Sequence, residues 1–173
     1  MINSQYIVEI LAKHHNRNSF SCGTEPLDHY LKKQAGQEAR KRLAVTYVLI
    51  DRENESHIAG YYTLSSTSII PGNLPEDVVK KLPRYESIPA TLIGRLAIDK
   101  SYQGQGLGKV ILIEALQQSL IISQKVASFA VVVDAKDMEA ATFYKNIGFI
   151  PFPSNAFRLF LPMKTIEMLF KNS

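Results

Sequence analysis

The chain has 173 residues, of which 46% are hydrophobic and 21% are charged, a size and composition typical of one compact globular domain. Charged residues interrupt the apolar positions of the first twenty residues. We therefore expect neither a signal peptide nor a membrane span, but a cytoplasmic protein with a single domain over residues 1–173. The one cysteine, Cys22, excludes an internal disulfide and a thiol pair for zinc, and we expect no metal.

The first part of the chain predicts a helix followed by a hairpin. Thr24 can cap a helix that tolerates Pro26 in its first turn and extends toward Arg42. Its apolar residues recur at helical spacing: Leu27, Tyr30, Leu31 and Ala35. Residues 45–50 and 57–67 are rich in β-favouring side chains and flank a polar turn, which predicts two antiparallel strands.

The middle of the chain predicts an excursion, a strand and a glycine-rich turn that opens a helix. Residues 71–89 contain four prolines around one short apolar-periodic piece, so we expect a long loop with one short helix. Residues 91–98 predict a strand, and the helix after the glycines keeps its apolar residues on one broad stripe.

The last part predicts a buried strand, a capped helix and a closing pair of strands. Residues 126–133 form a nearly continuous apolar run, typical of a strand covered on both faces. Asp137 can cap the next helix, and Gly148 stands where a left-handed terminator belongs. Residues 157–161 and 165–170 are expected to pair as strands around Pro162.

The glycine-rich turn is the strongest chemical signal in the sequence. It reads Gln103-Gly104-Gln105-Gly106-Leu107-Gly108-Lys109. Such a turn lets backbone amides approach a ligand, and the helix that follows offers free N–H groups and a positive dipole end, so it predicts a pyrophosphate site. The spacing matches neither the P-loop nor the dinucleotide fingerprint. The alternative is a tight strand-to-helix junction without a ligand.

Two motifs in this sequence resemble the GNAT acetyltransferase superfamily. Its cofactor signature, Gln/Arg-x-x-Gly-x-Gly/Ala, is met by Gln103, Gly106 and Gly108. Its later motif, Phe-Tyr-x-x-x-Gly-Phe, is met from Phe143 to Phe149. The resemblance implies an α/β (α+β) fold, with a mixed, mostly antiparallel twisted sheet and helices on both faces.

The resemblance also assigns the site residues, with acetyl-CoA as the acetyl donor. Tyr144 is implied as the general acid that donates to the leaving thiolate. The pantetheine arm would lie on one strand and the pyrophosphate on the turn, with Phe143 as a further contact. The implied cofactor-binding residues are Leu96, Ala97, Ile98, Gln103, Gly104, Gln105, Gly106, Leu107, Gly108, Lys109 and Phe143.

Three further segments resemble one branch of that family, the bacterial toxins that acetylate the amino acid carried on aminoacyl-tRNA. These segments are residues 20–31, 60–64 and 93–97. The resemblance implies blocked translation, a homodimer and inhibition by a ribbon-helix-helix antitoxin.

The basic residues fit an RNA substrate, because phosphate contacts need clustered Lys and Arg. The candidate contacts are Lys33, Arg40, Arg42, Lys81, Arg84 and Arg95. An α-amine with a pKa of about 7.7 also needs little help from a general base, whereas a lysine side chain at about 10.4 needs a good one. Asp99 is the one carboxylate that stands out for that role, and it can equally cap the turn.

Two other functions are compatible with the same residues. One is a non-toxic acetyltransferase acting on a small-molecule or protein amine. The other is a non-catalytic acyl-CoA-binding regulatory module, which would retain the glycine turn but not depend on Tyr144.

Overall fold

The computed structural model describes residues 3–172, except for the side chains of residues 55 and 56. Its internal contacts divide the chain into two compact units. The first unit consists of Met1–Ser65 and Gly94–Ala115, and the second of Ser66–Ile93 and Leu116–Ser173.

Three antiparallel strands build most of the first unit. They are β1 (Tyr6–Ile10), β2 (Val45–Asp51) and β3 (Asn54–Ile69). The amide of Glu53 donates to the Asp51 carboxylate at 3.0 Å in the turn between β2 and β3. The stacked rings of Tyr47 and Tyr62 fix the register between these two strands, with centroids 4.9 Å apart. The predicted hairpin is therefore confirmed.

The predicted helix over residues 24–42 is confirmed in position but is not continuous. It consists of α1 (Glu25–His29), one π-helical turn η1 (Tyr30–Gln34) and α2 (Ala35–Arg40). The prediction that Thr24 caps it is wrong for the side chain, which makes no cap hydrogen bond. Instead its carbonyl accepts from the amides of Leu27 and Asp28. Arg42, with φ of 59°, ends the segment in a left-handed conformation.

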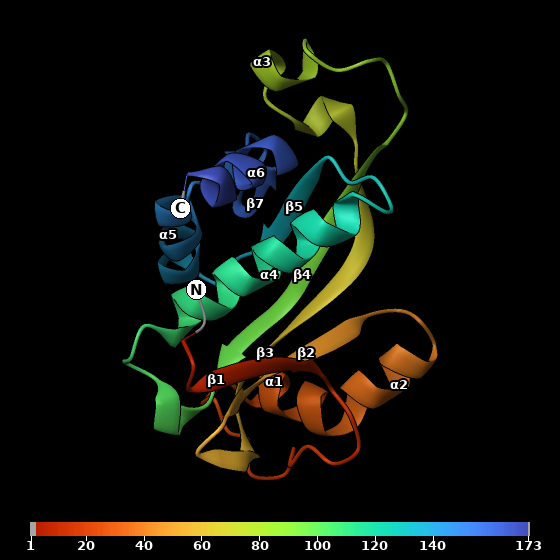
Figure 1. Cartoon of the computed structure of the whole chain (residues 1–173). Helices are drawn as coiled ribbons and strands as arrows, with labels where there is room; N and C mark the ends of the chain where they lie inside the picture. Colours follow the sequence, from red (N-terminus) through yellow and green to blue (C-terminus); the bar gives the residue numbers. More distant parts are fainter. Residues whose placement is uncertain (1–2, 173) are drawn as a thin grey trace. The chain divides into compact units, whose positions relative to one another are not determined.

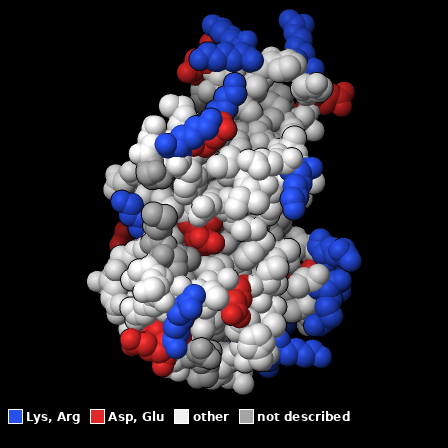
Figure 2. Space-filling view, in the orientation of Figure 1, with Lys and Arg blue, Asp and Glu red and all other residues white. Residues whose placement is uncertain are grey.

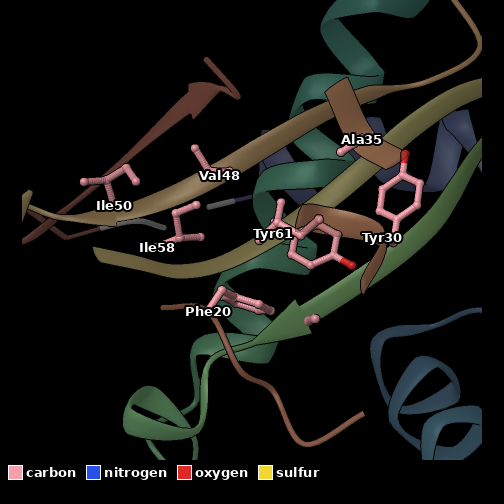
Figure 3. Close-up of a cluster of buried hydrophobic side chains, with 9 residues drawn as sticks. Phe20, Tyr30, Ala35, Val48, Ile50, Ile58 and Tyr61 are labelled. Carbon is pink, nitrogen blue, oxygen red and sulfur yellow. The ribbon is translucent and has the colours of Figure 1, made fainter. Parts of the chain in front are cut away.

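One cluster of buried side chains joins this helical segment to the strands of the first unit. The cluster contains the rings of Phe20, Tyr30 and Tyr61 and the aliphatic side chains of Val48 and Ile58 (Figure 3). Phe20 and Tyr61 make an edge contact with centroids 5.4 Å apart. Figure 1 shows α1 and α2 lying beside the strands that supply this cluster.

A glycine lets two strands of the first unit approach closely. β4 (Ile88–Ile98) ends beside Gly60 of β3, where a Cβ atom would lie 2.9 Å from the carbonyl oxygen of Ala97 and 2.7 Å from Ile98 Cδ1. After β4 come a short turn, η3 (Lys100–Tyr102), and the helix α4 (Leu107–Ser123). This strand, turn and helix match the predicted order.

The second unit contains the parallel pair of the sheet. The first part of β4 pairs in parallel with β5 (Ala130–Asp134), and β5 pairs antiparallel with β7 (Asn155–Pro162), which also pairs with β6 (Ile150–Phe152). The full strand order is β1-β2-β3-β4-β5-β7-β6.

The predicted strand over residues 126–133 starts too early, because Val126 is 71% exposed and its amide still donates to the carbonyl of Ile122 in α4.

The predicted closing strand over residues 165–170 is wrong, because this segment is helical. It belongs to α6 (Met163–Lys171), which follows Pro162 directly and buries Met163 and Ile166, one helical turn apart. The partner expected for β7 is supplied by β6, so residues 165–170 are not needed to complete the sheet.

The remaining helices follow their sequence signals. Asp137 caps α5 (Met138–Ile147), accepting from the amide of Ala140 at 2.8 Å, and Gly148 ends the helix with φ of 122°. The proline-rich excursion forms η2 (Pro71–Asn73) and α3 (Glu76–Val79), as expected for one short helix within a loop. Among residues 3–172, no helix combines the length and apolar character needed to cross a membrane.

The close approach at Gly60 predicts a large stability difference between two glycine substitutions. Gly60→Ala should lower the free energy of unfolding by about 1 to 3 kcal/mol, because the new methyl group meets a backbone oxygen that cannot move aside. Gly72→Ala is the matched control, since nothing lies within 4 Å of its Cβ position. Urea unfolding curves with equal midpoints for the two variants would contradict this account.

Candidate active site

The turn between β4 and α4 has a backbone that only glycine adopts easily. Gly104 has φ of 80° and Gly106 has φ of 77°. No protein atom lies within 4 Å of a Cβ built on either residue, so it is the backbone conformation that requires glycine, not crowding by neighbours. Residues 103–106 are exposed, and the turn faces open space.

The amides of this turn are free to bind a ligand. Within residues 3–172, Val110 is the first residue after Gln103 whose amide donates to a backbone carbonyl, that of Gly106 at 3.4 Å. Among the residues that the structure describes, the amides from Gly104 to Lys109 therefore have no backbone acceptor at the positive end of α4. Such an arrangement of N–H groups fits a pyrophosphate.

Asp99 organises the start of the turn. It is 2% exposed, and one carboxylate oxygen accepts from the amide and hydroxyl of Ser101 at 2.9 and 2.7 Å. The other oxygen accepts from the amide of Ser21 at 2.9 Å, and His57 Nε2 lies 3.4 Å from the carboxylate. Burial alone would raise the pKa of Asp99, but hydrogen bonds from Ser21 and Ser101 outweigh burial and lower that pKa below its usual value. Of the two roles left open for Asp99, the geometry favours the cap.

Both N–H donors of the Gln103 side chain bind within the protein. Its Nε2 donates to the carbonyl oxygens of Cys22 and Ile98, both at 2.8 Å. A glutamine amide has two N–H donors, so neither remains for a phosphate. Gln103 therefore shapes the turn through its side chain.

The strand residues expected at the pantetheine arm lie at the end of β4. The pairing of β4 with β5 covers Ala90 to Ile93, and β4 continues for five residues beyond it. Ala97 is buried in the core of the first unit, and the carbonyl of Ile98 accepts from Gln103. Contact of Leu96, Ala97 and Ile98 with a cofactor stays a prediction.

Tyr144 lies in an aromatic group on α5 in the second unit. Its ring contacts Phe143 and Phe149, with centroids 5.3 and 5.5 Å apart, and its side chain is 9% exposed. Burial first, and the charge of Asp134 second, raise the pKa of Tyr144 to about 12. The hydroxyl is thus protonated at every physiological pH. Tyr144 and the glycine turn belong to different units, and their joint action stays a prediction.

Five of the six predicted phosphate contacts are exposed. Figure 2 shows Lys and Arg side chains over α2 and, in the second unit, over the segment around α3. The exposed residues are Lys33, Arg40, Arg42, Lys81 and Arg84. Arg95 differs, because its guanidinium stacks 3.5 Å from the ring centroid of Tyr30 and lies 4.0 Å from Glu38. It is less available to a phosphate than the other five.

Several residues at these sites carried no usable signal in the sequence. Ser21 and His57 reach Asp99 from distant parts of the chain, and Asp134 acts on Tyr144 from the preceding strand. The motif that includes Phe149 was recognised, but the packing of its ring on Tyr144 was not predicted.

A second polar cluster, Glu9 with His14 and His15, has ligand atoms close enough for a metal ion, all within 4.8 Å of one another. The hydrogen bonds of His15 argue against that use. Its Nδ1 accepts from the amide of Ala12 at 2.8 Å, so its proton is on Nε2, which donates to Glu9 at 2.8 Å. A metal at Nε2 would displace that proton while Nδ1 remained an acceptor, so a hydrogen-bonded His15 and Glu9 pair fits better.

Comparison with known proteins identifies the family. The family model for the GNAT acetyltransferase domain matches residues 77–167, just over half of the chain. The chain belongs to the GNAT acetyltransferase family, and the predicted fold class is confirmed.

Within that family, the chain is similar to toxins. The probable toxin TacT of Sinorhizobium fredii is 31% identical over 162 residues, which cover 90% of this chain and 89% of TacT. A tRNA-acetylating toxin of Mycobacterium tuberculosis is 31% identical over 154 residues, 87% of this chain and 88% of the relative.

Two solved structures are similar along nearly the whole chain. AtaT complexed with acetyl-methionyl-tRNAfMet has a TM-score of 0.88 at 36% identity, covering 95% of this chain and 99% of that one. A tyrosine-to-phenylalanine mutant of AtaT bound to acetyl-CoA and the C-terminus of the antitoxin AtaR has a TM-score of 0.80 at 32% identity, covering 96% and 98%.

The raised pKa of Tyr144 is directly measurable. The difference in ultraviolet absorbance between wild type and Tyr144→Phe should show one phenol ionising near pH 12 instead of pH 10, and Asp134→Asn should lower that value. Because the folded pKa exceeds the unfolded one, the linked stability is complete below pH 10 and is lost as the pH rises to about 12. Ionisation of Tyr144 near pH 10 in the folded protein would contradict this environment.

Proposed function

We propose that this protein transfers an acetyl group from acetyl-CoA to the α-amine of the amino acid on an aminoacyl-tRNA, and so blocks translation as the toxin of a toxin-antitoxin pair. The main support is the turn at Gly104 and Gly106, whose amides have no backbone acceptor among the described residues. The chain is also similar, along about nine-tenths of its length, to a probable toxin and to a tRNA-acetylating toxin.

The turn has the donors that acetyl-CoA requires. The amides from Gly104 to Lys109 would hold the pyrophosphate, and the backbone of Leu96, Ala97 and Ile98 would hold the pantetheine arm. When bound, acetyl-CoA supplies an activated acetyl group and a thiolate leaving group. The open space above the two glycines supports this assignment, because a side chain there would occupy the approach to the amides.

Tyr144 serves as the hydrogen-bond donor for the departing sulfur. Full proton transfer from a phenol with a pKa of about 12 to a thiolate whose conjugate acid lies near 8.5 is unfavourable by about 3.5 pKa units. The hydroxyl therefore acts first by stabilising charge on sulfur through a hydrogen bond, as expected of a protonated donor in a water-poor setting. Asp134 and burial keep that donor protonated.

The acceptor amine needs no strong base in this mechanism. Asp99, the carboxylate considered for that role, is occupied by three hydrogen bonds and has a lowered pKa, so it is a weak proton acceptor. An α-amine, with a pKa of about 7.7 even before esterification of its carboxyl, is substantially neutral near pH 7 to 8. This favours an aminoacyl ester over a lysine side chain as acceptor.

The basic side chains of α2 and of the α3 segment supply the contacts for RNA phosphates. We assign this role to the exposed residues Lys33, Arg40, Arg42, Lys81 and Arg84, and a smaller share to Arg95, whose guanidinium is stacked on Tyr30.

The assembly and its control follow from the same assignment. We expect residues 1–173 to act as one acetyltransferase domain, located in the cytoplasm with aminoacyl-tRNA, as a homodimer inhibited by a ribbon-helix-helix antitoxin. The complex of AtaT with the C-terminus of AtaR supports the antitoxin. Light scattering that gives twice the chain mass of 19.4 kDa would support the dimer.

Replacing Tyr144 tests the enzyme. Tyr144→Phe should lower kcat for acetylation of aminoacyl-tRNA by about 10²- to 10³-fold, because the hydrogen-bond donor to sulfur is lost, while acetyl-CoA binding is retained. Tyr85→Phe is the control, since Tyr85 is 66% exposed. Mass spectrometry of the aminoacyl groups released from treated tRNA identifies the product.

Each alternative function predicts a different result. A non-catalytic acyl-CoA-binding module would show no acetyl transfer in wild type and no effect of Tyr144→Phe. A non-toxic acetyltransferase would modify peptides or small amines and leave aminoacyl-tRNA unmodified, and its induced expression would leave bacterial growth unchanged.

Replacing Arg40 tests the RNA surface. Arg40→Gln should weaken tRNA binding for all tRNAs alike and reduce the slope of log affinity against log salt by about 0.7 to 0.9, the share of one phosphate contact. Lys125→Gln, an exposed residue outside the predicted contacts, is the control. Equal salt slopes for wild type and Arg40→Gln would show that Arg40 makes no contact with an RNA phosphate.

A further inference from the structure

We propose that the segment Ser21–Cys22 supports the acetyl-CoA site by holding the glycine turn in place. Asp99 and Gln103 are the positioning residues that hydrogen-bond the turn to this segment. This inference rests on the proposed function of the turn. We call the three hydrogen bonds that join the segment to the turn the clamp: Ser21 N to Asp99 Oδ2, Lys100 N to Ser21 O, and Gln103 Nε2 to Cys22 O.

The clamp has short and complementary geometry. Its three donor-to-acceptor distances are 2.9, 2.8 and 2.8 Å. Both backbone groups of Ser21 are used, its N–H by the carboxylate and its carbonyl by the amide of Lys100. Gln103 also donates to the carbonyl of Ile98, so one side chain ties the end of β4, the turn and the segment together.

The segment is itself fixed, so it can serve as a support. Phe20, just before it, is fully buried in the core of the first unit (Figure 3). Within the segment, the amide of Cys22 donates to the buried carboxylate of Asp28 at 2.8 Å. Because these contacts fix the segment, its hydrogen bonds can hold the turn before Gly104 and Gly106 in one position.

The support lies far from the turn along the chain. The match to the GNAT family model covers residues 77–167, and Ser21 and Cys22 lie more than fifty residues before it. Gln103, the first residue of the cofactor signature, thus donates through its side chain to a carbonyl oxygen outside the matched residues.

The chemistry of Gln103 predicts which substitutions preserve the clamp. Two carbonyl oxygens must be reached by two N–H donors on one side chain. Methionine has a similar length but no donor. Arginine, which the cofactor signature also allows at this position, has several donors and can reach both carbonyls.

The test is acetyl-CoA binding and steady-state kinetics with Gln103→Met and Gln103→Arg. Gln124→Met is the control, because Gln124 is an exposed glutamine just after the end of α4. In Gln103→Met, calorimetry should show acetyl-CoA binding weakened about tenfold or more, as expected for two lost hydrogen bonds. The KM for acetyl-CoA should rise in step, with kcat and the KM for aminoacyl-tRNA little changed. Gln103→Arg should restore the affinity to within about threefold of wild type.

Hydrogen exchange tests the same linkage without a substitution at the turn. Acetyl-CoA should slow exchange of the amides of Ser21 and Lys100 in wild type, because both are donors in the clamp. In Gln103→Met this extra protection should be lost.

The outcomes separate this inference from the proposed function. A wild-type protein that does not bind acetyl-CoA would overturn the proposed function. Wild-type binding with no added protection of Ser21 and Lys100 would overturn the clamp, even if Gln103→Met failed to fold. Unchanged acetyl-CoA affinity in a folded Gln103→Met, whatever its thermal stability, would overturn it as well.

Discussion

The turn that follows β4 depends on one buried carboxylate, that of Asp99. A carboxylate buried away from water needs hydrogen-bond donors, and Ser21 and Ser101 donate these hydrogen bonds to Asp99. In satisfying this charge, the chain turns sharply after β4 and reaches the left-handed backbone at Gly104. The free amides at the start of α4 exist because the turn is held in this shape, not because any residue of the turn is itself reactive.

Local signals in the sequence predicted local structure well. The cap at Asp137, the terminator at Gly148 and the glycine turn were all correct, because each depends on the preferences of a few neighbouring residues. The side-chain cap at Thr24 was a local signal that failed. The larger error arose where partners distant in the sequence decide the outcome. Residues 165–170 were expected to pair as a strand with residues 157–161, but the partner of β7 at that edge is the three-residue β6, and residues 165–170 are helical.

The candidate site was only partly predictable for a related reason. The motifs located the turn and Tyr144, since these depend on residue types at fixed spacing. They could not locate Ser21 or Cys22, which contribute backbone groups that every residue except proline possesses in full. The π-helical turn at residues 30–34 likewise had no recognised sequence signal.

The clamp has a consequence for how the protein is made. Its hydrogen bonds join residues 78 and 81 positions apart in the chain, and closing a loop of about 80 residues costs about 4 kcal/mol of chain entropy. At about 5 to 20 residues per second, the turn leaves the ribosome about 4 to 16 seconds after Ser21. A nascent chain that stops before β4 therefore carries the basic helix without the turn, so the proposed RNA contacts on that helix are synthesised before the proposed cofactor site.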